Sequence, residues 1–378
     1  MVTIAIDASR AAAAQRTGTE AYSLHLIRAL LALGAERRSA RFTLYCRDTP
    51  PPHLFDLDAE RAALSVLPAP RLWTHVRFAA ALFRDRPDVT FVPAHTLPLA
   101  FPGPGVVTVH DLGFRHFPEA HPTAARLYLD LTTKHSARRA RAILADSACT
   151  RRDLTAFYGI DAAKIHVVYP GVDPTLAPVQ DAAALAEVRE HYGIPGPYLL
   201  HVGSLQPRKN LTRLIEAYAA WLPDAAPQRY LVLAGARGWL YDDIFATVRR
   251  LGLEAWVCFP GYVDDAHLAA LYSGADAFVF PSLYEGFGFP VLEAMRCRTP
   301  VICANTSSLP EVAGEAALLV DPLEVGALTN ALRRLTTDAA LRATLILQGE
   351  KQAARFTWER AAQQALDILE GGAPARRA

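Results

Sequence analysis

Residues 277–305 read AFVFPSLYEGFGFPVLEAMRCRTPVICAN, and this stretch shows the pattern that decides the fold. Its first letters, AFVFPS, have the apolar and aromatic composition of a buried strand, and PVICAN near its end is a second strand of the same kind. Pro290 suits the first turn of a helix between them, because a backbone N–H at that position would have no partner inside the helix. Strand, helix and strand in this order predict a βαβ unit of a parallel sheet.

The same alternation extends over nearly the whole chain. The strand candidates are residues 2–7, 41–46, 63–67, 88–94, 106–111, 140–146 and 164–170, followed by 198–205, 230–236, 257–262, 277–282, 300–305 and 316–321. A Pro- and Ala-rich stretch without a strand pattern, residues 174–184, separates the two sets. We therefore expect two doubly wound, Rossmann-like α/β domains, residues 1–178 and 179–356. The final helix, residues 357–370, follows the completed second set, and we expect it to pack back on the first domain.

Composition and charge exclude several classes of protein. The chain has 378 residues, of which 51% are hydrophobic, and this length favours two packed domains. Lys and Arg number 39 against 38 Asp and Glu, so the net charge of +1 indicates neither a nucleic-acid partner nor a strongly acidic one. Nothing in the composition indicates an oligomeric state.

The cysteines and the apolar segments bear on the compartment. Five scattered cysteines, with no C-x-x-C pair, favour reduced thiols over a disulfide framework or a zinc site. The N-terminus MVTIAIDASR indicates a first strand and not a signal peptide, and the longest uncharged segment, residues 91–110, is interrupted by prolines. These features predict a cytoplasmic protein. The basic helix at residues 126–141 is typical of a solvated face, and it leaves open a peripheral contact with anionic lipid at the inner face of the membrane.

Two glutamates flank the turn GFGFPVL, at a place where open α/β sheets bind ligands. Glu285 is expected in the loop before the helix and Glu293 within about its first turn, while Gly286 and Gly288 let the backbone bend and leave its amides accessible. Carboxylates accept hydrogen bonds from sugar hydroxyls, and amides at a helix N-terminus donate to phosphate. The pattern therefore favours a polyol that carries phosphate. The alternative is that both glutamates only complement the helix dipole.

A second strand end carries two cations. In HVGSLQPRKNL the strand ends at Gly203 and a helix begins near Asn210, so Arg208 and Lys209 stand just ahead of the helix N-terminus. Two cations held there would stabilise a diphosphate, each charge-assisted contact contributing about 1.5 to 3 kcal/mol. The alternative is a solvated basic pair.

The first domain offers weaker candidates. His110 ends the strand VVTVHD and could touch a bound hydroxyl or phosphate, although a single histidine there is more often structural. Gly18 stands at the start of the first long helix and could face an anion. The DLD run at residues 56–58 follows no strand end, so we expect no metal site.

These segments together resemble the retaining glycosyltransferases of family 4. EGFGFPVLE is similar to the E-x7-E signature of that family, and GSLQPRKNL, GYVDDAHLAALYSGADAFVFPS, ADSACTRRDL, VYPGVD and VHDLGF resemble further family blocks. The resemblance covers the chain from about Ile4 to the final helix. It implies the GT-B fold, in which two Rossmann-like domains face each other across a cleft, the first binding the acceptor and the second the donor.

The resemblance also assigns roles to residues. It implies that Arg208 and Lys209 hold the donor diphosphate, that Glu293 binds the ribose hydroxyls and that Glu285 binds the donor sugar ring. His110 would face the transferred sugar, and Gly18 would approach the diphosphate from the first domain. The remaining donor-binding positions are in the strand-end and turn backbone: Gly203, Gly286, Phe287, Gly288 and Phe289.

The activity implied is transfer of a hexose from a nucleotide diphosphate sugar to an acceptor hydroxyl, with retention at the anomeric carbon and no metal or other cofactor. The acceptor would be a glycan, a lipid-linked glycan or a small molecule. GVVTVHDLGFRHFPE, VPAHTLP and LAGARGW resemble O-antigen mannosyltransferases, which favours GDP-mannose. UDP-glucose, UDP-N-acetylglucosamine and dTDP-rhamnose stay open as donors.

Two departures from the family pattern and three alternative functions follow from the residues. Residues 11–22 contain only Gly18 where the family often has adjacent glycines, and RCRTP places Arg298 where a glycine is common. A nicotinamide-dependent dehydrogenase is disfavoured, because no G-x-G-x-x-G follows the first strand. A nucleotide-sugar epimerase of GT-B fold and a non-catalytic nucleotide-sugar-binding protein remain as alternatives.

Overall fold

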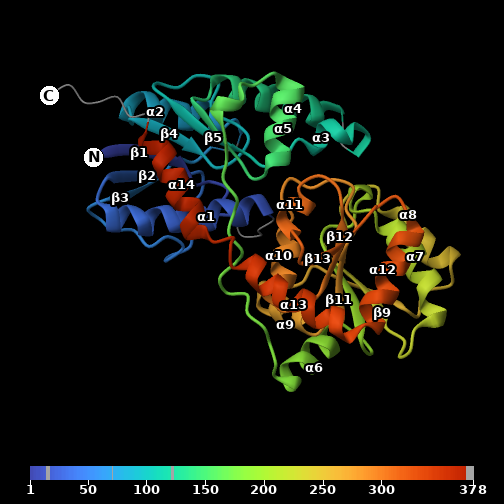
Figure 1. The fold of residues 1–378 in the computed structure, drawn as a ribbon. Coiled ribbons are helices and arrows are strands. Elements are labelled where there is room, and N and C mark those ends of the chain that lie inside the picture. The colour runs from blue at the N-terminus through green and yellow to red at the C-terminus, as the bar shows by residue number, and fades with distance from the viewer. Residues whose placement is uncertain (14–17, 70, 121–122, 372–378) are drawn as a thin grey trace. The chain divides into compact units, whose positions relative to one another are not determined.

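In a computed structural model, described here for residues 1–13, 18–69, 71–120 and 123–371, the chain divides into two compact units. The first unit contains Met1–Gly171 and the C-terminal segment from Phe356 onward, and the second contains Val172–Arg355. Each unit is an α/β structure built on one parallel sheet (Figure 1). The predicted pair of Rossmann-like domains is confirmed.

The sheet of the first unit has seven strands in the order β3-β2-β1-β4-β5-β6-β7, and all neighbouring strands pair in parallel. Its strands are β1 Val2–Asp7, β2 Ala40–Cys46, β3 Ala62–Val66, β4 Val89–Val92, β5 Gly105–Val109, β6 Ala142–Ala145 and β7 Ile165–Val167. The central strands are almost entirely buried and rich in Val, Ile and Ala, as a sheet covered on both faces requires.

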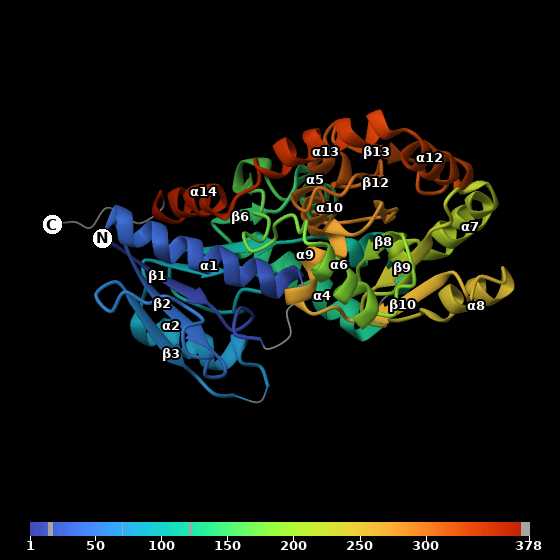
Figure 2. The ribbon, with the colours of Figure 1, turned by 90° about the horizontal axis from the view of Figure 1, so that it is seen from below.

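Helices connect these strands. They are α1 Gly18–Arg37, η1 Thr74–Phe78, α2 Ala79–Asp85, α3 Gly113–His116, η2 Pro118–Ala120, α4 Thr123–Arg139, α5 Ala148–Tyr158, η3 Ala162–Lys164 and, from the far end of the chain, α14 Trp358–Glu370. Helix α14 lies alongside α1 (Figure 2), where Arg37 Nη1 contacts Asp367 Oδ1 at 2.8 Å. Arg141 Nη2 donates to the carbonyl of Ile368 at 2.8 Å, so the C-terminal helix completes the first unit.

The second unit repeats the architecture with a six-stranded parallel sheet in the order β10-β9-β8-β11-β12-β13. Its strands are β8 Tyr198–Val202, β9 Tyr230–Ala234, β10 Val257–Gly261, β11 Ala277–Phe280, β12 Val301–Ala304 and β13 Ala317–Val320. Its helices are α6 Ala182–His191, η4 Pro207–Lys209, α7 Leu211–Trp221, η5 Leu222–Asp224, α8 Asp242–Arg250, α9 Asp265–Ser273, α10 Phe289–Arg296, α11 Leu309–Ala313, α12 Val325–Thr337 and α13 Ala339–Ala353.

The strand order reverses between β8 and β11, which are neighbours although two strands intervene in the sequence. In open parallel sheets this switch point leaves a crevice at the carboxyl ends of the strands, where ligands bind. The segments that follow β8 and β11 therefore lie at this switch point.

The boundary between the units differs from the expected one. The sequence predicts it after residue 178, but the first unit already ends at Gly171. Gly171 packs so closely on Trp358 that a Cβ at this position would lie 2.3 Å from the Trp358 backbone nitrogen, which ties it to α14. Five residues later Leu176 is buried, and its carbonyl accepts a hydrogen bond from Arg296 of α10, so this part of the Pro-rich segment packs on the second unit.

Apolar side chains of strands and helices form a core in each unit. In the first, Val107 and Ile143 of the sheet pack with Leu154 of α5, and in the second, Val279 and Ile302 pack with helix residues such as Leu214. Among the helices of the described ranges, none combines the length and the apolar character needed to cross a membrane.

Candidate active site

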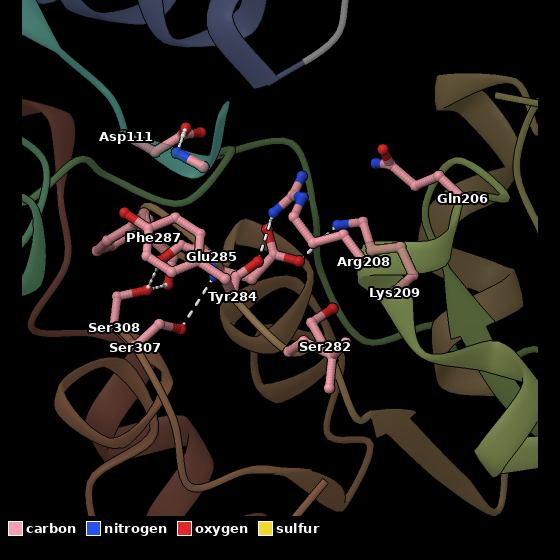
Figure 3. A network of polar contacts seen from close by, with 12 residues as sticks. Asp111, Gln206, Arg208, Lys209, Ser282, Tyr284, Glu285, Phe287, Ser307 and Ser308 are labelled. Atoms are coloured by element: carbon pink, nitrogen blue, oxygen red, sulfur yellow. Dashed lines mark hydrogen bonds and ion pairs between the residues drawn. The ribbon is translucent and has the colours of Figure 1, made fainter. Parts of the chain in front are cut away.

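The segments after β8 and β11 bring opposite charges together in the second unit. Lys209 Nζ donates to Glu285 Oε1 at 2.7 Å, and Arg208 Nη1 donates to Glu285 Oε2 at 2.9 Å (Figure 3). Arg208 and Lys209 belong to η4, which follows β8, and Glu285 lies in the loop after β11. Because β8 and β11 are neighbouring parallel strands, their carboxyl ends place these residues side by side.

This triad is buried. The side chains of Lys209, Glu285 and Arg208 are 9%, 10% and 19% exposed. Burial alone would raise the pKa of Glu285, but the two neighbouring cations outweigh it and bring that pKa down to about 2. The carboxylate is thus ionised at neutral pH, and two cations on one carboxylate leave a net positive charge. The net positive charge of this cluster attracts an anion.

The loop that carries Glu285 is held by two serines. Glu285 N donates to Ser307 Oγ at 2.9 Å, while Ser308 Oγ donates to the carbonyls of Glu285 and Phe287 at 2.9 and 2.6 Å. Gly288 follows with φ of 114°, and a Cβ there would lie 2.7 Å from Leu309 Cδ2. Only glycine fits this turn comfortably, so the loop conformation is strongly specified.

Helix α10 starts directly after this turn, at Phe289, with Pro290 in its first turn. Glu293 lies on this helix, and its Oε2 accepts a hydrogen bond from the hydroxyl of Tyr272 at 2.8 Å. Burial raises the pKa of Glu293 to about 7, although the Tyr272 hydrogen bond acts in the opposite direction. Glu293 is therefore poised to exchange a proton near neutral pH, unlike Glu285.

His201 is a buried histidine close to Lys209 of the triad. It is fully buried in β8, its ring stacks on that of Phe280, and its Nδ1 lies 3.0 Å from the carbonyl of Val279. Burial and then the charge of Lys209 lower the pKa of His201 to about 3, so the ring is neutral. A Cβ on Gly203 would lie 3.3 Å from His201 Nε2 and 3.4 Å from Lys209 Cε, so Gly203 leaves room for both side chains.

The first unit holds a second buried pair at its own strand ends. His110 follows β5, Asp146 follows the neighbouring strand β6, and His110 Nδ1 lies 2.7 Å from Asp146 Oδ2. The other ring nitrogen lies 3.3 Å from the carbonyl of Pro93, and the edge of Tyr22 packs at 4.7 Å between ring centroids. Burial by itself would lower the pKa of His110, but the Asp146 carboxylate outweighs it, so the pKa lies above its usual value.

Comparison with known proteins identifies the chain. Residues 186–352 match the family described as Glycosyl transferases group 1, and residues 16–176 match the family described as Glycosyltransferase Family 4. The O-antigen chain mannosyltransferase B of Escherichia coli is 34% identical over 302 residues, which cover 78% of each chain. The chain belongs to the family-4-like GT-B glycosyltransferases.

Other relatives and solved structures agree with this. The serotype-specific mannosyltransferase WbdA of Escherichia coli is 32% identical over 61% of this glycosyltransferase, a match that spans 28% of WbdA. A sucrose-phosphate synthase from Thermosynechococcus elongatus superposes with a TM-score of 0.75 at 25% identity, covering 97% of this chain and 98% of that one. Anabaena HepE in complex with UDP-glucose has a TM-score of 0.73 at 20% identity, with 98% and 100% covered. The GT-B fold and the enzyme class are confirmed.

The structure distributes the predicted site residues of this glycosyltransferase over its two units. Arg208, Lys209 and Glu285 meet directly, and Glu293 pairs with Tyr272. The remaining predicted positions of the second unit lie in the segments after β8 and β11: Gly203, Gly286, Phe287, Gly288 and Phe289. Their roles in donor binding stay predictions.

The predicted residues of the first unit are His110 and Gly18. Gly18 is the first residue of α1 and is exposed, while residues 14–17 before it lie outside the described ranges, so the proposed phosphate contact of Gly18 stays a prediction. Arg298, the departure from the family pattern, has φ of 62° at the end of α10 and an Nε 3.3 Å from Glu350 Oε1. A left-handed backbone explains why a glycine is common there.

Sequence reasoning missed Asp146, His201, Ser307 and Ser308. Asp146 closes the strand candidate ARAILAD, and the serines follow PVICAN, so all three stand at strand ends, as the predicted site residues do. His201 could have been noticed as one polar residue in the apolar strand YLLHV. In the described part of the chain, no group of three or more His, Cys, Asp or Glu side chains is arranged to hold a metal ion.

Proposed function

We propose that this glycosyltransferase moves a hexose, mannose in the first instance, from a nucleotide diphosphate sugar to a hydroxyl of a glycan or lipid-linked glycan, with retention at the anomeric carbon and without a metal ion. The observation that carries the proposal is the buried triad in which Arg208 and Lys209 flank Glu285. It combines what a sugar nucleotide needs, namely cations for the pyrophosphate and an ionised carboxylate for hydroxyls.

The two cations would serve the leaving group. When the bond between the anomeric carbon and the β-phosphate oxygen breaks, negative charge grows on the diphosphate, and fixed cations in a buried site stabilise it without reorganisation. Arg208 offers a planar fork of donors and Lys209 a point charge, so the two differ in what they can hold. Glu285 holds both cations in place before the donor arrives.

The chemistry follows a front-face course. The acceptor oxygen forms a bond to the anomeric carbon on the face from which the diphosphate leaves, and the acceptor proton passes to a phosphate oxygen of the leaving group. The products are a glycoside, in which the sugar is bonded to the acceptor oxygen, and a nucleoside diphosphate, which carries the acceptor proton. The protein contributes charge stabilisation, positioning and exclusion of water.

The ribose would contact Glu293, and the transferred sugar would contact His110. Glu293 would accept hydrogen bonds from ribose hydroxyls, for which the ionised form is required. His110, held by Asp146, would donate to a hydroxyl of the transferred sugar.

Mannose is favoured over glucose by the relatives. Three named relatives are the O-antigen chain mannosyltransferase B, the mannosyltransferase WbdA and, at 32% identity, the mannosylfructose-phosphate synthase of Agrobacterium fabrum. UDP-glucose is the second candidate donor, because HepE binds it on the same fold. The scattered, free cysteines support a location in the reducing cytoplasm.

The test is a hydrolysis and transfer screen over GDP-mannose, UDP-glucose, UDP-N-acetylglucosamine and dTDP-rhamnose, with and without excess EDTA. We expect nucleoside diphosphate release to be fastest with GDP-mannose, to survive EDTA and to yield an α-linked product from an α-linked donor by NMR. Complete loss in EDTA that magnesium restores would overturn the metal-independent reaction. An epimerised nucleotide sugar formed without acceptor would indicate the epimerase instead, and tight donor binding without turnover would indicate a non-catalytic binder.

A further inference from the structure

The connection between β2 and β3 leaves a cavity in the first unit. Parallel strands that are neighbours are usually joined through a helix, but residues 47–61 join β2 to β3 without one. A cavity of about 380 Å³ lies between this segment, helix α1 and the amino-terminal parts of the two strands. Pockets that bind small organic molecules have volumes from about 300 Å³ upward, so the cavity is large enough for one.

The segment of residues 47–61 is anchored on the protein, so the cavity is preformed. Leu54 is buried, and Arg28 Nε of α1 donates to its carbonyl at 2.9 Å. Further along, the carbonyl of Arg61 accepts from Phe42 N of β2 at 2.8 Å. These contacts hold the walls of the cavity in place before a ligand binds, which lowers the cost of ordering on binding.

Much of the cavity lining is apolar. Its larger apolar side chains are those of Leu31, Phe42, Leu54 and Leu57. Gly34 lets α1 approach the sheet so closely that a Cβ at this position would lie 2.3 Å from Phe42 Cε2, and this close packing fixes the aromatic ring. An apolar ligand would therefore bury its surface against side chains that are already held in place.

Arg61 contributes a buried donor to the same cavity. Its side chain is 16% exposed, and within the described residues its buried Nη1 has no hydrogen-bond partner. Its Nε lies 3.8 Å from Asp58 Oδ2, which is an ion-pair distance but too long for a hydrogen bond. An arginine does not lose its charge in a protein, so burial cannot neutralise the group. The buried Nη1 therefore needs an acceptor that the described protein does not provide.

The charges around the cavity narrow the class of ligand. Arg28 and Arg61 line it together with His53 and with both carboxylates of the DLD run, Asp56 and Asp58. The carboxylates are exposed whereas Arg61 is largely buried, so the arginine is the stronger influence inside the cavity. A phosphate with two negative charges would be repelled by the two aspartates more than a single carboxylate would. A carboxylate also matches the planar fork of arginine donors.

The cavity is separate from the candidate active site. Phe42 pairs with Ala62 near the amino ends of β2 and β3, and both residues line the cavity. His110 follows β5 at the opposite, carboxyl edge of the same parallel sheet. Substitutions in the lining can thus be made without changing the residues proposed to bind the sugar nucleotide.

We propose that this cavity binds a small organic monocarboxylate with an apolar body. The ligand carboxylate would accept from Arg61 Nη1, and the apolar body would pack on Leu31, Phe42 and Leu54. A neutral molecule of the same shape would bury the same apolar surface but would bring no charged acceptor to Arg61. The site goes beyond the transfer reaction and does not depend on the donor.

Titration of the full chain with 4-phenylbutyrate, followed by ligand-observed NMR, tests the site. We expect saturable binding with a Kd of about 1 mM or lower, as is typical for a ligand of this size. The neutral analogue 4-phenylbutan-1-ol should bind about tenfold more weakly or worse, because it lacks the charge-assisted hydrogen bond. The dianionic 4-phenylbutyl phosphate should also bind more weakly than the carboxylate.

Two variants with matched controls locate the binding. Arg61→Gln should weaken binding of 4-phenylbutyrate by about tenfold or more, whereas Arg41→Gln, at an exposed arginine of β2 outside the lining, should not. Ala32→Phe places an aromatic ring from α1 into the cavity and should abolish binding. Its control is Ala340→Phe, at an exposed alanine of α13 in the second unit, which should bind as the wild type does.

The readouts separate binding from folding and from catalysis. Circular-dichroism melting and hydrolysis of the preferred sugar nucleotide should be unchanged in Ala32→Phe, because this alanine is exposed and remote from the triad. That variant keeps the test decisive even where Arg61→Gln is unstable. The proposal is overturned by an absence of saturable binding up to about 10 mM, by equal binding of the acid and the alcohol, or by unchanged binding in Ala32→Phe. Competition of 4-phenylbutyrate with the sugar nucleotide would place the carboxylate in the active site instead.

Discussion

Lys209 Nζ lies 2.7 Å from Glu285 Oε1, joining two residues 76 positions apart in the sequence. Both side chains are at least nine-tenths buried, and they meet because β8 and β11 are neighbours in the sheet. Glu285 and Lys209 are therefore electrostatically coupled, so replacing either residue changes the electrostatic environment of the other.

Replacement of Lys209 by Ala should lower transfer by about two orders of magnitude or more, because one fixed cation at the leaving group is lost. It should also lower the melting temperature, since a buried Glu285 that loses a partner is costly, by about 3 to 5 kcal/mol for a fully buried pair. The double variant Lys209→Ala with Glu285→Gln should regain much of the stability and none of the activity. Thermal melts and donor hydrolysis measured on the three proteins check this, and equal melting of the single and double variants would mean that the pair is not coupled.

Replacement of Asp146 by Asn should impair catalysis through His110. Without the carboxylate, burial dominates and the pKa of His110 falls, so the charged form of the ring is disfavoured. We expect kcat to fall by about tenfold or more, with the alkaline limb of its pH profile moved to lower pH. The matched control is Asp153→Asn, which removes the carboxylate 2.9 Å from the half-exposed His116 of the same unit and should leave the profile as it is. An unshifted profile in Asp146→Asn would contradict the positioning role.

Glu293 should make donor binding depend on pH near neutrality. Its pKa of about 7 means that the carboxyl is largely protonated at pH 6 and ionised at pH 8, so the KM for the donor should fall as pH rises through this range. Glu293→Gln should have a higher KM that no longer varies there. Steady-state kinetics from pH 6 to 8 provide the measurement, and a variant that keeps the wild-type pH dependence would assign it to another group.

The same carboxyl should affect stability in the opposite sense. Its pKa is raised on folding from a usual value of 4.5 to about 7, so the native state binds this proton more tightly than the unfolded chain does. That contribution is fully present below the unfolded pKa and is lost as pH rises to about 7. Urea unfolding of the wild type and Glu293→Gln at several pH values should therefore show the wild type losing more stability between pH 5 and 8.

Ser308→Ala should loosen the loop that carries Glu285. The buried hydroxyl donates to the carbonyls of Glu285 and Phe287, and its loss leaves two acceptors without that donor, at a cost of about 1 to 3 kcal/mol. We expect a lower melting temperature together with weaker donor binding. Ser65→Ala, in the edge strand β3 of the other unit, is a control expected to change neither. Unaltered donor affinity in Ser308→Ala would show that the loop is held by its other contacts.

Much of the fold could be predicted from the sequence, because its signals are local. Apolar runs that alternate with helical segments indicate strands buried on both faces. Pro290 suits the first turn of a helix, because an N–H there would have no partner within the helix. Gly288 permits a backbone angle that other residues resist. The same logic located Arg208, Lys209, Glu285 and His110 at the ends of strands. These inferences need only a few neighbouring residues each.

Tertiary structure alone decided which of those strand ends meet. The strand order places β8 beside β11 and β5 beside β6, and this order sets the contacts of Glu285 with two cations and of His110 with Asp146. The early boundary at Gly171 likewise comes from packing on α14, near the other end of the chain. Local sequence determined the helices, the strands and the polar residues at their ends. The partners and pKa values of the site residues depend on burial and on charges distant in the sequence, and these come together only when the sheets have assembled.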